Sequence, residues 1–405
     1  MCRWFAYISP SEECLLEDVL ITPPHGLAKQ VHEHYLPKLF SHTPGEETTG
    51  QEITLRNRLF NVDGFGMAWY TCARSDFEKP TTTTTGTTGI TAHPRPAVYK
   101  NSQPPTNDAN FHSICANTAT TALFAHIRAA TGASSVATIN NHPFTFGRHT
   151  VMHNGLISDF ADVRRAMLPL IAKAEYENVR GTTDSEHLAA LYMTNLTRPR
   201  SATTAAAAAA AATPTSTSSS KSKSKSKSSP SSDLATAWSQ TYPPSEMLSA
   251  LVDAFKSVIA LQQETLGAEN VKACSLNVCC TDGEQLVAVR LRNHPTEQPP
   301  SLYYSTTAGV TLNRKYPGSA AGAHEQNNTD TDTDTDTDTD ATKKAPAEHG
   351  RHVIVASEPT TYKPGEWTLI EKNHALLVDA RGNVTVEPVH LPLDLMAQAA
   401  TGKSF

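Results

Sequence analysis

A few widely spaced residues of this chain could together cleave an amide bond. The first is Cys2, which directly follows the initiator methionine in the stretch MCRWFAYIS. A thiol can attack a carbonyl carbon as a nucleophile. The following aromatic, β-rich residues also fit a buried strand opened by a structural cysteine, which is the commoner situation. Cys2 therefore needs partners elsewhere in the chain before a catalytic role is indicated.

Arg128 and the pair Asn154-Gly155 are the next candidates. Arg128, in FAHIRAATG, ends an apolar segment and offers a planar cation that can hold a carboxylate through two hydrogen bonds. A structural ion pair explains it equally well. Asn154 and Gly155, in HNGLI, offer a side-chain amide and a backbone N–H that could both point at one oxygen, as in an oxyanion hole. In isolation, Asn-Gly more often forms a hairpin turn.

Asp184 is the fourth candidate and lies in GTTDSEHL, at the start of an amphipathic segment. Its carboxylate could accept a hydrogen bond from a substrate ammonium group. Asp184 or the neighbouring Thr183 could instead cap the helix that follows. The two roles can belong to the two adjacent residues.

A thiol nucleophile also needs a base. If Met1 is removed, the α-amino group of Cys2 has a reference pKa of about 7.7–8.0, which suits proton transfer near neutral pH. One residue then supplies both nucleophile and base, as in N-terminal threonine enzymes.

Together these groups describe a site for a γ-glutamyl amide. The thiol of Cys2 attacks the side-chain carbonyl, and Asn154 with Gly155 stabilises the tetrahedral oxyanion. Arg128 and Asp184 bind the α-carboxylate and the α-amino group at the other end of the substrate.

The histidines do not indicate a metal site. Five of them cluster in sequence, but they lack HExxH or a comparable ligand spacing: His126, His142, His149, His153 and His187. We expect neither a catalytic metal nor a cofactor.

Composition restricts the partners and the compartment. With 34 Lys and Arg against 40 Asp and Glu, the net charge is −6, so the chain lacks the overall positive charge that is typical of nucleic-acid-binding proteins. No apolar run approaches the ~18 residues of a membrane span, and the chain does not open with a secretory signal. The seven cysteines are scattered without paired CxxC spacing. A reduced, cytoplasmic protein that binds neither nucleic acid nor membrane is expected.

The hydrophobic pattern predicts a mostly antiparallel α+β protein. We expect helices at 26–39, 158–173, 184–196 and 244–264. Strands are expected at 2–8, 64–70, 121–128, 150–153, 275–280, 285–291, 302–306, 352–356, 374–379 and 383–387.

Low-complexity tracts interrupt these elements. They include TTTTTGTTG at 81–89, an alanine run followed by KSKSKSKSSP within 201–232, and repeated Thr-Asp within 327–340. Such tracts lack the apolar area that offsets the cost of chain ordering. We therefore expect one domain over residues 2–405 with disordered insertions at about 41–52, 75–110, 198–235 and 315–349.

Several motifs in order resemble the class II glutamine amidotransferases of the N-terminal-nucleophile superfamily. These motifs are Cys2, HIRAATG, NHPF, HNGLI and TDSE. The opening residues, LLEDVLITPPHGLAKQ and VIVASEPTTYKPGEWTLIEKNHALLV are most similar to the fungal amidotransferase subunit that degrades glutathione and to the bacterial γ-glutamyl hydrolase of ergothioneine synthesis.

The resemblance implies a four-layer αββα sandwich and assigns roles by position. Cys2 matches the nucleophile, Arg128 and Asp184 the substrate-binding pair, and Asn154 with Gly155 the oxyanion hole. Many members have Trp after the substrate-binding arginine; Ala129 stands there in this chain and fits a site that admits a larger γ-glutamyl group.

The expected activity is hydrolysis of a γ-glutamyl amide, glutathione above all, through a Cys2 thioester. We expect no acceptor domain of the phosphoribosyltransferase, isomerase or synthetase type, and the glutathione-degrading relatives imply a metallopeptidase-like partner subunit. Two alternatives remain: a glutaminase subunit that supplies ammonia to a separate synthase, and a non-catalytic scaffold of the same fold.

Overall fold

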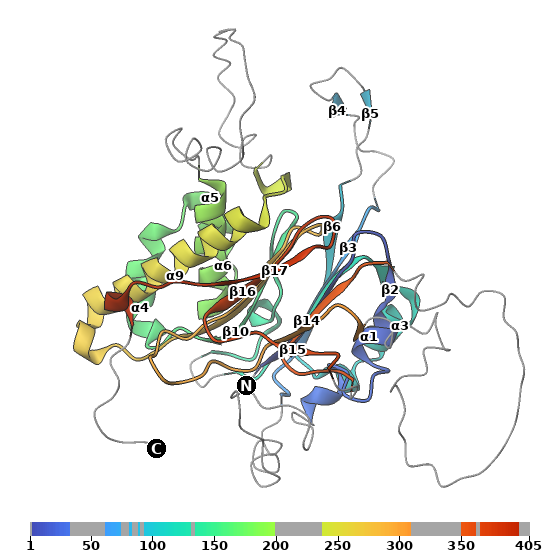
Figure 1. Ribbon diagram of the computed structural model, residues 1–405, viewed down its shortest axis with the longest axis horizontal. Coiled ribbons are helices and arrows are strands. Elements are labelled where there is room, and N and C mark those ends of the chain that lie inside the picture. The colour runs from blue at the N-terminus through green and yellow to red at the C-terminus, as the bar shows by residue number, and fades with distance from the viewer. Residues whose placement is uncertain are drawn as a thin grey trace, which may run out of the picture.

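The computed structural model describes residues 2–32, 61–73, 81–82, 88–89, 93–130, 134–198, 237–308, 350–361 and 365–396. Two antiparallel sheets lie face to face, and helices cover the outer face of each (Figure 1). This arrangement confirms the α+β class and the expected four-layer αββα order.

The first sheet has seven strands. In spatial order they are β15 (Thr368–Leu369), β13 (Tyr303–Ser305), β14 (Val353–Ala356), β1 (Arg3–Ile8), β8 (Ala122–Ile127), β3 (Phe65–Thr71) and β6 (Arg95–Asn101). The second sheet has six: β17 (Val384–Pro388), β16 (His374–Val378), β12 (Leu286–Arg290), β11 (Ser275–Thr281), β10 (His149–Leu156) and β9 (Phe144–Phe146).

Two short strand pairs lie outside these sheets: β2 (Cys14–Leu15) with β7 (Ala119–Thr120), and β4 (Thr81–Thr82) with β5 (Thr88–Gly89).

The helices divide between the two sheets. The first sheet is covered by α1 (Leu16–Leu20) and α3 (Ala109–Asn117), and the second by α4 (Phe160–Met167), α5 (Lys173–Asn178), α6 (Asp184–Thr197) and α9 (Pro244–Leu266) (Figure 1). Short 3-10 turns complete the described chain: η1 (Lys29–Val31), η2 (Pro105–Asn107), η3 (Thr138–Asn140), η4 (Leu168–Leu170), η5 (Ala268–Asn270) and η7 (Leu393–Leu395). Among these helices, none has the length and apolar character needed to cross a membrane.

Strand alternation assigns the side chains of β1 to two different cores. Phe5 and Tyr7 pack into the core beneath α1 and α3. Trp4 and Ala6 belong to the core between the two sheets. Successive side chains of a strand point to opposite faces, so Cys2 shares the inter-sheet face with Trp4.

Gly66 on β3 lets the backbone at His142 pack closely against the first sheet. A Cβ added there would lie 2.1 Å from the carbonyl oxygen of His142 and 2.9 Å from Cγ of Lys100. The backbone oxygen cannot move aside as a flexible side chain could, so only glycine fits.

Gly66→Ala is therefore expected to reduce the free energy of unfolding by about 3 kcal/mol, a typical cost of overpacking a tight site. Denaturant unfolding followed by circular dichroism measures it. The matched control is Gly350→Ala, where the nearest atoms are side-chain atoms of Ser11 and Glu12 at 3.0 and 3.2 Å. Equal unfolding midpoints for the two variants would contradict this account of Gly66.

Two of the four predicted helices differ from the structure. A helix was predicted at 26–39. Residues 26–32 instead form turns and η1, and residues 33–39 lie outside the described residues. The helix expected at 158–173 is divided into α4, η4 and α5, because Pro169 cannot donate the next helical hydrogen bond.

The segment expected to be disordered at 75–110 is ordered in its second half. Residues 95–101 form β6, which pairs along its whole length with β3. Tyr99 packs against the core under α1 and α3, which supplies the apolar contact that the neighbouring threonine-rich tract lacks. Within 81–89, Thr81–Thr82 and Thr88–Gly89 also pair. The other expected insertions lie almost wholly outside the described residues.

Candidate active site

Cys2 directly precedes the first residue of β1 and is partly exposed. The register pairs Arg3 with Ile127 and Trp4 with His126, so Cys2 lies beside Arg128 at the ends of β1 and β8. The Cys2 Sγ atom accepts a hydrogen bond from the Ala129 N–H at 3.3 Å and lies 3.5 Å from the Ala129 carbonyl oxygen.

Burial raises the pKa of the Cys2 thiol, while the Ala129 N–H and the charges of Arg128 and Arg3 act in the opposite direction. The raised pKa keeps the thiol protonated at neutral pH. Attack on a carbonyl therefore requires a base that removes this proton.

Arg128 continues the β8 ladder through its own N–H, which donates to the Gly64 carbonyl at 2.8 Å. Its buried guanidinium donates to the Ser135 carbonyl at 3.0 Å and to Ser134 Oγ at 2.7 Å. Among the described residues no carboxylate lies within ion-pair distance, so a structural ion pair is not what holds it. The remaining donors can bind a ligand carboxylate.

Three of the candidate residues, Arg128, Cys2 and Asp184, lie close enough to affect one another electrostatically. Burial lowers the pKa of the guanidinium, and nearby Cys2, Asp63 and Asp184 raise it in turn. The thiol, the guanidinium and the carboxylate of Asp184 are thus close enough to interact electrostatically.

Asn154 lies inside β10, paired with Asn277 of β11, so the hairpin turn considered from sequence was wrong. Met152, two residues earlier, belongs to the core between the sheets, and strand alternation turns Asn154 to the same face. There β10 lies against β1 and β8 of the first sheet, with His126 Nε2 3.3 Å from the His153 carbonyl oxygen. Asn154 therefore lies at the same end of the sandwich as Cys2 and Arg128.

The side-chain amide of Asn154 has an unfilled donor. Its Nδ2 atom is buried and has no hydrogen-bond partner among the described residues. An unpaired buried donor costs about 1–3 kcal/mol, so native proteins rarely retain one without a use. A ligand oxygen between the sheets would satisfy it.

Gly155 must be glycine for steric reasons. A Cβ there would lie 1.8 Å from the Ser275 carbonyl oxygen and 2.7 Å from His153 Nε2. The bare backbone lets β10 approach β11 closely, immediately beside the Asn154 amide.

Asp184 is the first residue of α6, and Thr183 is its N-cap, with Oγ1 accepting from the Glu186 N–H at 3.2 Å. The Asp184 carboxylate accepts from the Ile157 N–H at 2.9 Å and from the Ser185 N–H at 2.7 Å. These bonds fix the carboxylate between the end of β10 and the start of α6. Oδ1 also accepts from Ser185 Oγ at 3.1 Å, so Oδ2 is the oxygen that retains a lone pair for a ligand ammonium.

Sequence reasoning missed the loops that hold the arginine. Asp63 Oδ2 accepts from the Ala130 N–H at 2.7 Å, and the Asn140 amide donates to the Ser135 carbonyl at 3.0 Å. Asn140 Oδ1 in turn accepts from the Thr182 N–H at 2.9 Å. The only available signal was position: Asp63 precedes Gly64 and the strand predicted at 64–70, and the serines follow Arg128 closely.

The histidines near the site are packed inside the protein. The His126 and His142 rings stack with centroids 4.0 Å apart, and burial lowers the pKa of His126 to about 3. His153 bonds Ser185 Oγ at 2.9 Å through Nδ1. The described part of the chain contains no group of three or more His, Cys, Asp or Glu residues that could hold a metal.

Comparison with known proteins identifies relatives in sequence. No family model matches the chain. It is 25% identical over 379 residues to the probable glutamine amidotransferase DUG3 of Saccharomyces cerevisiae, covering 93% of this chain and 82% of that protein. It is 26% identical over 191 residues to the gamma-glutamyl-hercynylcysteine sulfoxide hydrolase of Mycolicibacterium smegmatis, covering 47% of this chain and 62% of that protein.

Solved structures give weaker matches. A class-II glutamine aminotransferase domain protein from Silicibacter pomeroyi superposes with a TM-score of 0.48 and 17% identity, over 96% of this chain and all of that chain (100%). The glutamine phosphoribosylpyrophosphate amidotransferase of B. subtilis gives a TM-score of 0.45 and 10% identity, over 96% of this chain and 50% of that longer chain.

Proposed function

We propose that this chain, a homologue of the glutamine amidotransferases, hydrolyses γ-glutamyl amides through Cys2 and that glutathione is its substrate. The observation that carries the proposal is the unpaired Asn154 amide, which shares one end of the sandwich with the thiol of Cys2 and the guanidinium of Arg128. These are the donor, the nucleophile and the carboxylate anchor that cleavage of a γ-glutamyl bond requires.

In the proposed mechanism, removal of Met1 frees the α-amino group of Cys2. The amine takes the thiol proton, and the thiolate attacks the γ-carbonyl carbon of the substrate. Asn154 Nδ2 and the Gly155 N–H donate to the resulting oxyanion. The tetrahedral intermediate collapses, the C–N bond breaks, and the Cys2 ammonium protonates the departing amine.

The γ-glutamyl thioester is then hydrolysed, with the amine of Cys2 again acting as the base. The amine of Cys2 removes a proton from water, and the resulting hydroxide attacks the thioester carbonyl. The C–S bond breaks, glutamate leaves, and the thiol regains a proton. Arg128 and Asp184 hold the α-carboxylate and α-ammonium groups through both steps.

The surroundings of the thiol favour a substrate with a larger leaving group than ammonia. Ala129 contacts the Cys2 Sγ atom through its backbone and carries only a methyl side chain. The M. smegmatis relative is named as a hydrolase of a γ-glutamyl compound that contains cysteine. Glutathione likewise carries its γ-glutamyl group on a cysteine amine.

Glutamate release from glutathione and from glutamine, measured with a Cys2→Ser control, tests the proposal. A kcat/KM at least tenfold higher on glutathione supports it. Preference for glutamine with ammonia transfer to a synthase would favour the glutaminase alternative. If no γ-glutamyl substrate releases glutamate in a Cys2-dependent way, the remaining alternative is a non-catalytic scaffold of the same fold.

We also propose a cytoplasmic enzyme that works with a metallopeptidase-like partner subunit. Cys2, Cys72, Cys115, Cys274, Cys279 and Cys280 form no disulfide among the described residues, which suits a reducing compartment. The partner is proposed from the family resemblance and is tested by affinity capture of the tagged chain from its native cells. Recovery of the chain without a stoichiometric peptidase-like subunit would count against it.

Arg128→Lys should raise KM about tenfold with little change in kcat, because lysine retains the charge but lacks the planar fork that binds a carboxylate bidentately. Steady-state kinetics on glutathione measure both constants. Exposed Arg165, replaced by lysine, is the matched control. An unchanged KM in Arg128→Lys would remove the guanidinium from substrate binding.

The pH profile should follow the amine rather than the thiol. The base must be unprotonated to act, so kcat/KM should rise about tenfold per pH unit below the pKa of the amine, whose reference value is about 7.7–8.0, and then level off. Because burial raises the pKa of the Cys2 thiol, its spontaneous ionisation should not set the profile in this range. A rate that climbs without a plateau through pH 9 would assign the profile to the thiol instead.

A further inference from the structure

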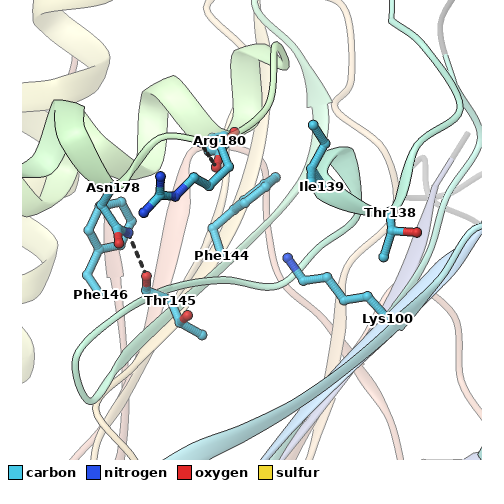
Figure 2. Close-up of a pocket in the computed structure, with 9 residues that line it drawn as sticks. Lys100, Thr138, Ile139, Phe144, Thr145, Phe146, Asn178 and Arg180 are labelled. Carbon is cyan, nitrogen blue, oxygen red and sulfur yellow. Dashed lines mark hydrogen bonds between the residues drawn. The ribbon is translucent and has the colours of Figure 1, made fainter.

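A second pocket opens at the edges of the two sheets, where β6 approaches β9. Its volume is about 270 Å³, and its lining includes Lys100, Ile139, Phe144, Arg180 and Glu186. Figure 2 shows Lys100 extending from its strand toward Phe144, while Arg180 lies across from it on the segment before α6. None of these side chains was assigned to the site described above, where only the backbone N–H of Glu186 appears, as the donor to Thr183 Oγ1.

Lys100 presents a charge that the described residues do not neutralise by direct contact. It shares the inter-sheet face of the first sheet with Gly66, with which it is in register. Its Nζ atom lies 5.0 Å from the centroid of the Phe144 ring. Within the described chain it has no hydrogen-bond partner and no carboxylate at ion-pair distance, although Glu186 is close enough to influence it.

Hydrogen bonds hold the Glu186 carboxylate and the loop of residues 180–182 in place beside the pocket. Glu186 accepts from the N–H groups of Arg180 at 2.9 Å and Gly181 at 2.6 Å. Asn140 connects the same loop to the Arg128 loop, because it accepts from the Thr182 N–H at 2.9 Å and donates to the Ser135 carbonyl at 3.0 Å. Since the Glu186 carboxylate is tied to this loop, Lys100 and Arg180 are the groups left to attract a ligand.

We propose that this pocket is a second small-molecule site, which binds an organic oxyanion, carboxylate or phosphate, attached to a short apolar body. The Lys100 ammonium holds the charged group, Phe144 and Ile139 contact the apolar body, and Arg180 adds to the positive field. The volume lies just below the ~300–1,000 Å³ typical of drug-sized ligands, so the occupant is small.

The ionisation of Lys100 gives this site a pH signature. Burial lowers the pKa of Lys100 to about 8, opposed by the carboxylate of Glu186. The other groups near Lys100 are Arg180, which is cationic, and the buried His126 and His142, whose pKa values burial lowers. An anion binds the protonated lysine, so its dissociation constant should increase by up to tenfold per pH unit above about pH 8.

Benzoate and phenyl phosphate serve as probes, with benzamide as a neutral analogue of benzoate. Saturation-transfer NMR titrations of the full-length chain at pH 7 should show binding of at least one anion and none of benzamide. The two anions distinguish a carboxylate site from a phosphate site. Failure of both to bind at 10 mM (roughly the limit of a specific site) would overturn the proposal.

Variants then locate the bound anion. Lys100→Met should weaken binding at least tenfold, and Lys100→Arg, which retains the charge, should restore most of it. Lys173→Met, on exposed Lys173, should change nothing. Binding that survives Lys100→Met but is lost in Arg128→Met would place the probe in the γ-glutamyl site and overturn the proposal.

This experiment does not depend on the proposed hydrolase activity. Thermal unfolding of each variant checks that it is folded, and the titration needs no turnover. A chain that binds benzoate through Lys100 but cleaves no γ-glutamyl amide would support the pocket while refuting the proposed function.

Discussion

Cys2→Ser should reduce kcat/KM on glutathione by at least ~10⁴-fold while leaving the fold intact. Serine is nearly isosteric, and among the described residues the hydrogen-bond partners of the Sγ atom are the backbone N–H and carbonyl of Ala129. A hydroxyl is a far weaker nucleophile than a thiol whose proton can be removed by the adjacent amine. Glutamate release measured over hours, with thermal unfolding as the folding check, determines the loss.

The matched control for this variant is Cys72→Ser, which changes an exposed cysteine. It should retain full activity. A second control uses one wild-type chain before and after a protease removes an N-terminal tag to leave Cys2 at the amino terminus. Activity that is equal before and after cleavage would contradict the role of the free amine.

Asn154→Ala should lower kcat about 10²–10³-fold with KM changed by less than about threefold. The amide is proposed to bind the oxyanion only as it develops, so its removal raises the barrier more than it weakens binding. Its Nδ2 atom has no partner among the described residues, so the substitution leaves no protein acceptor unpaired at that atom. The unfolding midpoint should therefore change little.

Asn277 provides a matched control because it is the residue paired with Asn154 on the adjacent strand. Its Nδ2 donates to the Pro300 carbonyl at 2.9 Å. Asn277→Ala should cost stability, about 1–2 kcal/mol, without a comparable loss of kcat. If both variants lose stability and neither loses turnover, Asn154 is a structural residue and the oxyanion hole lies elsewhere.

The apolar patterns of the strands predicted the α+β class and the positions of most strands, whereas the four layers were implied by the family resemblance. The segment at 150–153 was predicted as a strand ending before Asn154, yet β10 continues to Leu156. Local turn preference favours a break at Asn-Gly, but pairing with β11 on one side and helix packing on the other stabilises extended backbone. Tertiary packing, rather than local turn preference, therefore places Asn154 inside a strand.

Other parts of the site could not be derived from local pattern. Ser134, Ser135 and Asn140 hold Arg128 through loop geometry, which depends on how the loop packs rather than on residue periodicity. Lys100 lay in a segment expected to be disordered because a threonine-rich tract precedes it. Only the pairing of β6 with β3 places its ammonium group in a pocket.

Intact-mass spectrometry of the acid-quenched reaction tests the central claim most directly. Protein purified from its native cells should lack Met1, and mixing with glutathione should add the mass of one γ-glutamyl group. Peptide mapping should locate that group on Cys2, and hydroxylamine should remove it as expected for a thioester. An active protein that retains Met1, or an adduct at any residue other than Cys2, would contradict the account.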